Sequence, residues 1–416
     1  MLRFQRHGPL SDQGSWVDGD TGQGPPGSVQ QRHPAASQRR RATFVFGLLP
    51  VLFVHIGCLF ADRAWAQEAS DSVDAYLRRE ISTRRIPGLS VAVIRNGRVE
   101  KLAAYGVASL EFGVSATPST LFNVASITKA FTAVAVMMQV EAGKLTLDDS
   151  IGHHLDSLPA AWRSVTVRQL LNNTSGLPDL SDNPYTAHSI AKTVPEAFRL
   201  LGDRPVEFSA GSKWSYNQTN YMLLGMLIEK LTGLPFDRYC VGRFFEPVGS
   251  QSAAFGDART VIPSRATGYT MFRLDPAPPR RLDRPEVLYY ESEPLTYAGG
   301  GLNVSVTGFA AWLVALEGGR FVTRRSLGEI WNPAKLANGD IYNRPQTSSV
   351  WTAYGLGWVL IPRSAHQAVG GTGGLRAAFF IYPDDHLAVV ILTNLQGAGP
   401  ESLVEGVAKF YLPVRR

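Results

Sequence analysis

Hydrophobic and polar positions alternate most clearly toward the two ends of the chain. On the N-terminal side, the pattern predicts a helix over Asp71–Ile81. Two β-rich runs follow, Ser90–Ile94 and Val99–Gly106, and Asn96-Gly97 between them is the strongest short signal for a hairpin. This part of the chain is therefore predicted to form a helix and then an antiparallel hairpin.

β-Rich runs return near the C-terminal end. Strands are predicted over Gly355–Ile361, Leu375–Tyr382 and Leu387–Thr393, and a closing helix is predicted over Glu401–Tyr411. The long segment between the two ends, from about residue 126 to 316, is helical and loop-rich. Strands at both ends with helices between them predict an α+β fold, in which an antiparallel β-sheet is flanked by helices and carries an inserted all-helical domain.

The predicted domain covers residues 67–412, and neither a repeat nor a long linker interrupts it. Its sheet is expected from about residues 86–115 and 350–412, and the helical or loop insertion from about residues 140–300. Within the insertion, Asp275–Pro285 is rich in proline and arginine and is predicted to be a surface loop.

Residues 1–66 have the character of a leader. Residues 1–38 are rich in Gly, Pro, Gln, Ser and Arg, a composition typical of disorder. Arg39-Arg40-Arg41 then precede an apolar run from Ala42 to Phe60, which is closed by Ala64-Trp65-Ala66. This pattern is typical of an export signal cleaved after Ala66 and predicts a periplasmic or secreted protein. The alternative is an uncleaved membrane anchor, because residues 42–60 are about long enough to span a bilayer.

Charge and cysteine content indicate whether a nucleic-acid partner and an internal disulfide are to be expected. The formal net charge is +6, but no basic patch with interleaved aromatic residues occurs, so no nucleic-acid partner is predicted. Cys58 lies in the predicted leader, which leaves Cys240 alone in the mature chain. A lone cysteine cannot form an internal disulfide, and Cys240 is expected to be a buried apolar side chain.

The first candidate for chemistry is Ser126-Ile127-Thr128-Lys129, which opens an apolar helix over Ala130–Ala142 that Gly143 ends. The spacing places the serine hydroxyl and the lysine amine on one face of the helix. Free N–H groups at a helix N-terminus favour the anion that develops when the serine attacks. A lysine desolvated by apolar neighbours loses its proton more readily, which makes Lys129 a candidate general base for Ser126.

A Ser-x-x-Lys pair is a weak signal by itself, because about one chance match is expected in a chain of this length. The chain contains a second one, Ser189-Ile190-Ala191-Lys192. Pro195 follows it closely and excludes a long buried helix there. The assignment of Ser126 therefore depends on other motifs.

Five motifs follow one another along the chain. They are Leu121-Phe122-Asn123-Val124-Ala125-Ser126-Ile127-Thr128-Lys129, Val165-Thr166-Val167-Arg168-Gln169-Leu170-Leu171 with Thr174-Ser175-Gly176-Leu177, Trp214-Ser215-Tyr216-Asn217-Gln218-Thr219-Asn220-Tyr221 with Leu223-Leu224-Gly225, Ala298-Gly299-Gly300-Gly301-Leu302, and Gly370-Gly371-Thr372-Gly373-Gly374. In order and spacing, residues 86–395 resemble the superfamily of serine β-lactamases and penicillin-binding proteins, particularly its class C and esterase branch.

The resemblance implies that Tyr216, the first residue of a Tyr-x-Asn element, transfers protons together with Lys129. The third residue of that element is Gln218 here, which keeps an amide but moves it by one methylene group. A competing register, Ser215-Tyr216-Asn217, fits the Ser-x-Asn element of other branches. Ser181-Asp182-Asn183 also matches that element, but it lies among turn residues.

The last motif departs from the family. Gly371 stands where Lys or His usually precedes Thr-Gly, and loss of that cation argues against substrates with a carboxylate. Arg376 is a possible replacement whose direction strand alternation leaves open. By the resemblance, Thr372 and Gly373 border the substrate, and the backbone N–H of Gly374 forms the oxyanion hole with that of Ser126.

The function predicted from these residues is hydrolysis of an ester or amide through an acyl-enzyme on Ser126. Two alternatives stay open: a D,D-peptidase or β-lactamase, and a non-catalytic penicillin-binding or interaction protein. The predicted partner is a small-molecule or peptide substrate, and a membrane only if the leader is uncleaved. No cofactor or metal is implied, since His153 and His154 are adjacent and lack a helical Glu-bearing pair.

Overall fold

A computed structural model describes residues 68–181, 189–249, 252–273, 280–290, 292–344 and 350–413. Within these ranges, every helix is too short or too polar to cross a membrane. The predicted leader, with its apolar run over residues 42–60 and the cleavage site after Ala66, lies outside the described residues. Asp182 and Asn183 of the alternative Ser-x-Asn motif also lie outside them.

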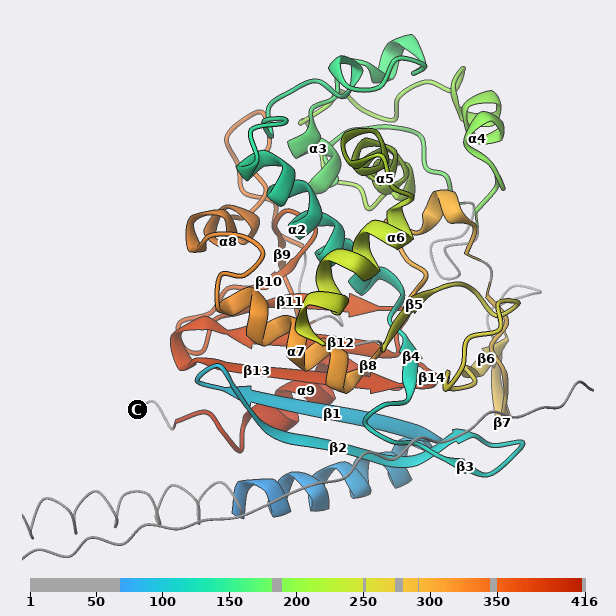
Figure 1. Ribbon diagram of the computed structural model, residues 1–416, viewed down its shortest axis with the longest axis vertical. Helices are drawn as coiled ribbons and strands as arrows, with labels where there is room; N and C mark the ends of the chain where they lie inside the picture. The colour runs from blue at the N-terminus through green and yellow to red at the C-terminus, as the bar shows by residue number, and fades with distance from the viewer. Residues whose placement is uncertain are drawn as a thin grey trace, which may run out of the picture. The chain divides into compact units, whose positions relative to one another are not determined.

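Eight antiparallel strands form the main sheet, in the lower half of the view in Figure 1. Their order is β3-β2-β1-β13-β12-β11-β10-β9, so the first hairpin pairs with the last strands of the chain. Their bounds are β1 (Gly88–Arg95), β2 (Arg98–Ser109), β3 (Val114–Ser115), β9 (Ala353–Tyr354), β10 (Val359–Ile361), β11 (Ala368–Gly373), β12 (Ala377–Tyr382) and β13 (Leu387–Thr393). The predicted antiparallel sheet, built from both ends of the chain, is confirmed.

The β1–β2 hairpin turns where the sequence predicts it, because Asn96 and Gly97 have φ of +51° and +70°. Of the strand predicted over residues 355–361, only the last three residues form a strand, β10, and β9 ends before it at Tyr354. Gly357 has φ of +77°, and the N–H of Gly355 donates to the carbonyl of Trp358, which closes a turn between the two strands.

Both faces of the central strands are buried, which explains why β12 and β13 are buried at every position. Successive side chains alternate between two cores. Ala92 and Ile94 pack with α2 (Thr128–Glu141) and α7 (Val306–Glu317), whereas Val91 and Val93 pack with α9 (Pro400–Ala408) and the helix over residues 68–84. That first helix and α7 lie on opposite sides of the sheet in Figure 1.

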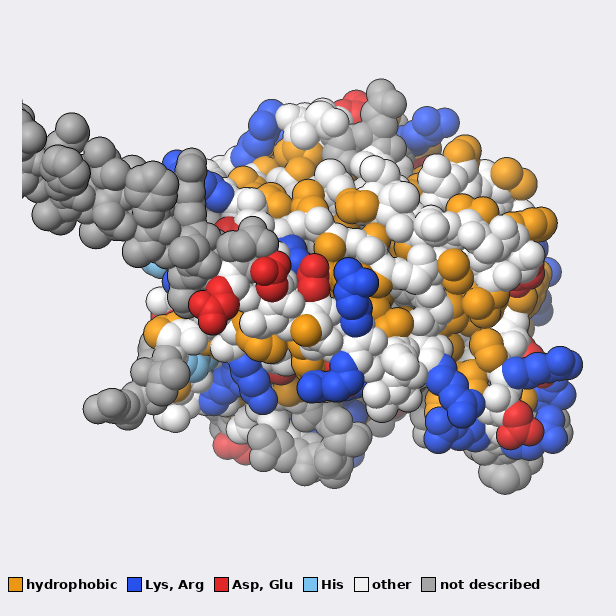
Figure 2. Space-filling view, turned by 90° about the horizontal axis from the view of Figure 1, so that it is seen from below, with side chains coloured by type: hydrophobic (Ala, Val, Ile, Leu, Met, Phe, Trp, Pro, Cys, Tyr) orange, Lys and Arg blue, Asp and Glu red, His pale blue; other side chains and the backbone are white. Residues whose placement is uncertain are grey.

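The first helix is fixed to the sheet by polar contacts as well as apolar ones. The phenol of Tyr105 donates to Asp74 at 2.6 Å, and Lys101 pairs with the same carboxylate. Arg84 pairs with Glu80 within the helix. Figure 2 shows this side of the molecule, where basic and acidic side chains lie among apolar ones.

Helices and short turns fill the region above the sheet. The helices are α2 (Thr128–Glu141), α3 (Val167–Leu171), α4 (Val194–Leu201), α5 (Gln218–Thr232), α6 (Phe236–Cys240), α7 (Val306–Glu317), α8 (Arg324–Ile330) and, below the sheet, α9 (Pro400–Ala408). Single turns are η1 (Ala125–Ile127), η2 (Ile151–His153), η3 (Ala160–Trp162), the π-type η4 (Val241–Phe245), η5 (Glu246–Val248), η6 (Pro294–Thr296) and η7 (Pro383–Asp385).

The prediction was an all-helical insertion, but the segment between the two ends of the sheet also contains strands. It contains two three-stranded sheets, β4-β8-β5 and β14-β6-β7. Their strands are β4 (Leu121–Asn123), β5 (Ala253–Phe255), β6 (Tyr269–Arg273), β7 (Arg280–Val287), β8 (Leu302–Ser305) and, from the C-terminal end, β14 (Leu395–Gln396).

The described part of the loop predicted over Asp275–Pro285 belongs to strand β7, so that prediction was wrong. β7 pairs with β6 in an antiparallel ribbon, with Thr270 opposite Glu286 and Phe272 opposite Arg281. The register shifts between these pairs, and Pro285 falls in that irregular stretch. Proline cannot donate to a ladder, and a bulge on an exposed ribbon is where a strand tolerates it.

Candidate active site

Ser126 lies in a strained turn between β4 and α2. Ala125, directly before it, has φ of +44°, a value that non-glycine residues seldom adopt. The hydroxyl of Thr128 donates to the carbonyl of Ala125 at 2.6 Å, and the N–H of Ile127 donates to the carbonyl of Val124 at 3.1 Å. Ser126 is half-buried in η1, immediately ahead of the helix that the sequence predicts.

Lys129 occupies the first turn of α2 and is almost completely buried, with 1% of its surface exposed. Its Nζ donates to Gln218 Oε1 at 2.9 Å and to the carbonyl of Gly299 at 2.8 Å. The amine also lies 4.8 Å from the ring centres of Tyr216 and Tyr221. The structure therefore places the amine in a small chamber of neutral groups contributed by distant parts of the chain.

This chamber changes the proton affinity of the amine. Burial lowers the pKa of Lys129 from its ordinary 10.5 to about 7, against a smaller opposing effect of the Asp179 carboxylate, which raises it. No described carboxylate forms an ion pair with Lys129. A substantial fraction of the amine is therefore neutral at neutral pH and can accept a proton.

Tyr216 lies at the rim of the site, with 38% of its surface exposed. Desolvation raises the pKa of its phenol well above the usual range, and the neighbouring Ser126 hydroxyl has a smaller, opposite effect. The adjacent Trp214 stacks on Tyr342, with ring centres 4.4 Å apart, and fixes the loop. The structure thus brings Tyr216 to Ser126 in its protonated form, which suits a proton donor.

Gln218 begins α5, and its register supports the Tyr-x-Asn alignment. Its side chain accepts from Lys129, while the side chain of Asn217 points elsewhere, donates to the carbonyl of Leu177 and caps the helix. The extra methylene group of glutamine therefore does not prevent contact with the lysine. The alternative register would give that role to Asn217, and its contacts do not fit it.

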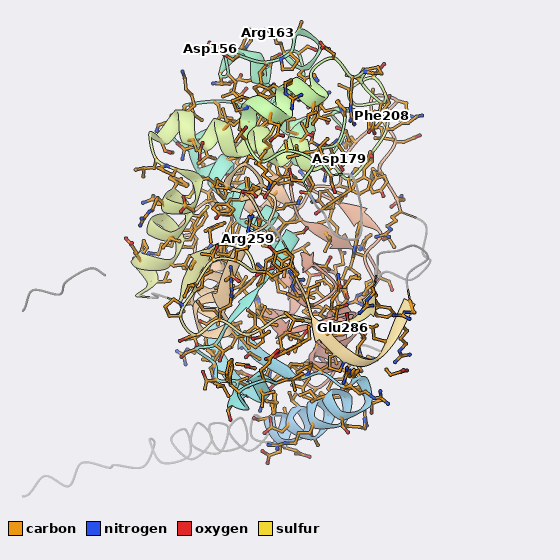
Figure 3. The ribbon with its side chains drawn as sticks, turned by 90° about the vertical axis from the view of Figure 1, so that its right-hand side faces the viewer. Asp156, Arg163, Asp179, Phe208, Arg259 and Glu286 are labelled. Carbon is orange, nitrogen blue, oxygen red and sulfur yellow. The ribbon has the colours of Figure 1, made fainter. Side chains whose placement is uncertain are left out.

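Asp179 is a site residue that the sequence reasoning missed. Its Oδ1 accepts from the backbone N–H of Gln218 at 2.7 Å and of Ser181 at 3.2 Å. Burial raises the pKa of its carboxyl group, and its charge acts on Lys129. Figure 3 shows Asp179 well below the outer tip that carries Asp156. Its place two residues after the Thr-Ser-Gly-Leu motif is the one sequence signal for it.

Strand β11 passes directly against the serine turn. A Cβ atom on Gly373 would lie 1.9 Å from the carbonyl oxygen of Val124, so only glycine allows this approach. A Cβ on Gly374 would lie 3.1 Å from the Cβ of Ala125, which brings the Gly374 N–H beside the same turn. That N–H donates to no other described residue. Thr372 is half-buried and points to the opposite face of the strand.

Gly371 has its Cβ direction filled by an aromatic ring. A Cβ there would lie 2.8 Å from Cε1 of Phe379, which faces it across the β11–β12 pair. Phe379 is fully buried and packs on Phe309 and Trp358, with ring centres 5.0 and 5.1 Å away. The buried ring of Phe379 therefore occupies the space that a cationic side chain at position 371 would need.

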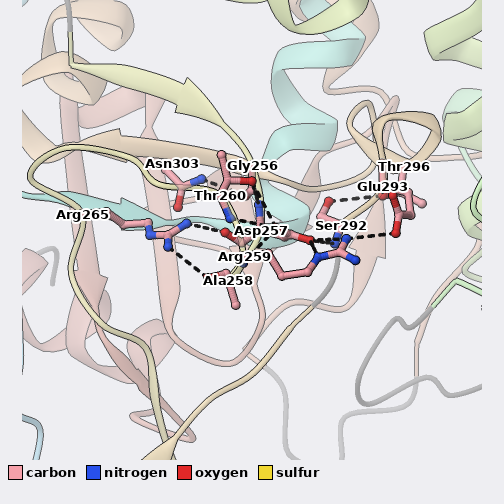
Figure 4. A network of polar contacts seen from close by, with 10 residues as sticks. All are labelled: Gly256, Asp257, Ala258, Arg259, Thr260, Arg265, Ser292, Glu293, Thr296 and Asn303. Carbon is pink, nitrogen blue, oxygen red and sulfur yellow. Dashed lines mark hydrogen bonds and ion pairs between the residues drawn. The ribbon is translucent and has the colours of Figure 1, made fainter. Parts of the chain in front are cut away.

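The loop that supplies the Gly299 carbonyl is held from two sides. The hydroxyl of Thr132, one turn after Lys129, donates to the carbonyl of Ala298 at 2.7 Å. Behind the loop, Arg259 joins Asp257 to Glu293, and the N–H of Ser292 donates to Asp257 at 3.4 Å (Figure 4). These contacts position the loop that accepts a hydrogen bond from Lys129.

The other candidates lie away from this site or in a different environment. Ser189 and Lys192 precede α4 in irregular chain, and the Ser189 hydroxyl donates to the carbonyl of Ala191. Cys240 is buried, as expected, and burial raises the pKa of its thiol well above the ordinary value. Asn173, just before the Thr-Ser-Gly-Leu motif, has φ of +61° and accepts from Asn220, so its side chain supports the loop.

Comparison with known families gives one match that covers most of the chain. The family model Beta-lactamase matches residues 73–410. This range includes all of the residues assembled around Ser126.

Individual relatives are more distant. Protein flp of Staphylococcus aureus (strain NCTC 8325 / PS 47) is 25% identical over 209 residues, which are 49% of this chain and 42% of that protein. The chain therefore spans less than half the length of this relative.

Among solved structures, D-amino acid amidase from Ochrobactrum anthropi SV3 is 23% identical with a TM-score of 0.68, over 82% of this chain and 98% of that chain. EstCE1, a hydrolase with promiscuous acyltransferase activity, is 21% identical with a TM-score of 0.68, over 83% and 99%. These two likenesses show a shared fold.

Proposed function

Because the chain belongs to the Beta-lactamase family, we propose that it is an exported serine hydrolase that cleaves an ester or an amide through an acyl-enzyme on Ser126. The observation that carries the proposal is the state of Lys129. Among the described residues, the groups that contact this buried amine are neutral, and its pKa of about 7 allows it to act as a base at neutral pH.

In the first step, Lys129 accepts the proton of the Ser126 hydroxyl while the serine oxygen attacks the carbonyl carbon of the substrate. Gln218 and Gly299 accept hydrogen bonds from the amine and hold it in place. The negative charge that develops on the carbonyl oxygen is stabilised by the backbone N–H groups of Ser126 and Gly374.

Tyr216 then protonates the leaving group, and its phenol recovers a proton from the Lys129 ammonium. The raised pKa keeps the phenol protonated at neutral pH, so a proton is present when the leaving group departs. Water attacks the acyl-enzyme next, with the same groups moving protons in the opposite direction. The acid is released, and the Ser126 hydroxyl is restored.

The surroundings of Gly371 favour an uncharged acyl group over a carboxylate-bearing lactam or peptide. A β-lactamase or D,D-peptidase of this kind would need a cation where the Phe379 ring fills the space. The fold is shared with an amidase and with a hydrolase of promiscuous acyltransferase activity, and these serve as analogies for the proposed class of substrate.

The test compares the protein with its Ser126→Ala variant on three substrates. These are a short-chain nitrophenyl ester, a chromogenic cephalosporin and a fluorescent penicillin. The proposal expects ester turnover that disappears in the variant, with cephalosporin turnover much slower than ester turnover.

The other outcomes separate the alternatives. Serine-dependent cephalosporin turnover faster than ester turnover would indicate a β-lactamase. Stable penicillin labelling without turnover would indicate a binding protein. Equal ester turnover by both forms would refute Ser126 as the nucleophile.

A further inference from the structure

Arg376 is a buried arginine that touches both sides of the proposed oxyanion hole. It is the last residue of the turn over residues 374–376 that joins β11 to β12, and 6% of its surface is exposed. A Cβ on Gly374 would lie 3.0 Å from Cζ and Nη1 of this arginine. The guanidinium group therefore lies directly behind Gly374, one of the two proposed oxyanion donors.

On its other side, the guanidinium group holds the chain just before Ser126. Its Nε donates to the carbonyl of Asn123 at 3.2 Å, and its Nη2 donates to Asn123 Oδ1 at 2.5 Å. The same Oδ1 accepts from the backbone N–H of Ala125 at 3.1 Å. Asn123 thus links the Arg376 guanidinium group to the backbone of Ala125, the residue with a positive φ that orients the serine turn.

No described carboxylate pairs with this arginine. Its Cζ lies 5.1 Å from the ring centre of Tyr290, and its hydrogen bonds reach neutral oxygen atoms of one residue. Burial of a charge without an ionic partner is costly and is found mostly where the group serves a function. A fork of donors in fixed geometry suits the joining of two backbone segments, which a lysine cannot do.

We infer that Arg376 is a positioning residue of the oxyanion hole, which fixes the serine turn against the Gly374 turn through its fork on Asn123. The inference rests on the proposed function, because it concerns the two N–H groups that would stabilise the anion. Its positive charge also lies behind those donors, where it favours a developing negative charge.

The experiment measures kcat and KM for the nitrophenyl ester in the wild type, Arg376→Met and Arg376→Lys. It also measures the affinity of each form for a phosphonate that mimics the tetrahedral intermediate. Arg376→Met is expected to lower kcat about 100-fold with little change in KM, since loss of one oxyanion donor has an effect of that size. Affinity for the phosphonate should fall in parallel with kcat/KM. The kcat and the phosphonate affinity of Arg376→Lys should lie between those of the wild type and Arg376→Met.

Two further variants separate positioning from general stability. Arg363→Met is the matched control, because Arg363 also lies over a tyrosine ring and donates hydrogen bonds, but at the edge of the sheet with Glu405. It should change neither kcat nor phosphonate affinity. Because part of the effect of Arg376 acts through the side chain of Asn123, Arg376→Met should lower kcat by a smaller factor in the Asn123→Ala background than in the wild type. If Arg376→Met does not fold, Arg376→Lys and Asn123→Ala carry the comparison.

The outcomes distinguish this inference from the proposed function. Full kcat and phosphonate affinity in folded Arg376→Met or Arg376→Lys would overturn the inference and leave the function in place. Additive losses in the double variant would overturn the route through Asn123. Ester turnover by the wild type that is independent of Ser126 would refute the proposed function, and the inference with it.

Discussion

The buried charge of Lys129 should make the stability of the protein depend on pH in a way that the variant Lys129→Met removes. In the unfolded chain the amine binds a proton up to its ordinary pKa of 10.5, and in the folded chain only up to about 7. Between these values the unfolded state binds one proton more, so the free energy of unfolding rises with pH.

The size of the effect follows from the two pKa values. Each pKa unit is worth about 1.4 kcal/mol, so the full difference corresponds to on the order of 5 kcal/mol. Between pH 7 and pH 9, the free energy of unfolding should rise by about 2 kcal/mol of this total. Methionine has a similar length and no charge. The substitution removes the hydrogen bonds to Gln218 and Gly299, which changes the free energy of unfolding by the same amount at every pH. The contribution from protonation of the amine, in contrast, depends on pH.

The assay is urea unfolding of both proteins at pH 7, 8 and 9. The free energy of unfolding of the wild type should gain about 2 kcal/mol relative to Lys129→Met over this range. Lys101→Met serves as the control, because it removes another buried lysine, one that is paired with Asp74 away from the site. It should follow the wild type. Parallel pH dependence of the wild type and Lys129→Met would show that the amine stays charged, and would refute its role as a base at neutral pH.

Three further predictions address the site. Asp179→Asn removes a charge that raises the pKa of Lys129, so the acidic limb of the pH profile of kcat/KM should move to lower pH, while Asp156→Asn at the exposed tip leaves it unchanged. Gly373→Ala should lower the free energy of unfolding by about 1–3 kcal/mol in urea titrations and abolish ester turnover, because its Cβ would overlap Val124. Gly300→Ala, whose Cβ meets no atom within 4 Å, should retain both, and equal effects of the two variants would contradict the packing argument. Gly371→Lys should lower stability without creating cephalosporin turnover, since its side chain would displace Phe379; efficient turnover would contradict this view of the pocket.

Much of the local structure follows from short stretches of sequence. The Asn96-Gly97 hairpin, the end of α2 at Gly143 and the absence of a buried helix at Ser189 depend on backbone preferences of a few neighbouring residues. The sheet from both ends of the chain was also predictable, because strand patterns gather there. Strand β7 was not, since its pairing with β6 outweighs the proline signal, and the break between β9 and β10 follows from the positive φ of Gly357 inside an apolar run that reads as one strand.

The chemistry of the site was decided by tertiary structure. The sequence by itself determined that Ser126 and Lys129 share one helical turn and that a set of motifs follows them in order. It could not determine the proton affinity of Lys129, because that depends on burial by distant segments, which bring Gln218 and Gly299, 89 and 170 residues further along the chain, to the amine. It also left open the direction of Arg376, and the fold aims that side chain at Asn123, 253 residues away. Desolvation and hydrogen bonding act through space, so only the packed structure fixes them.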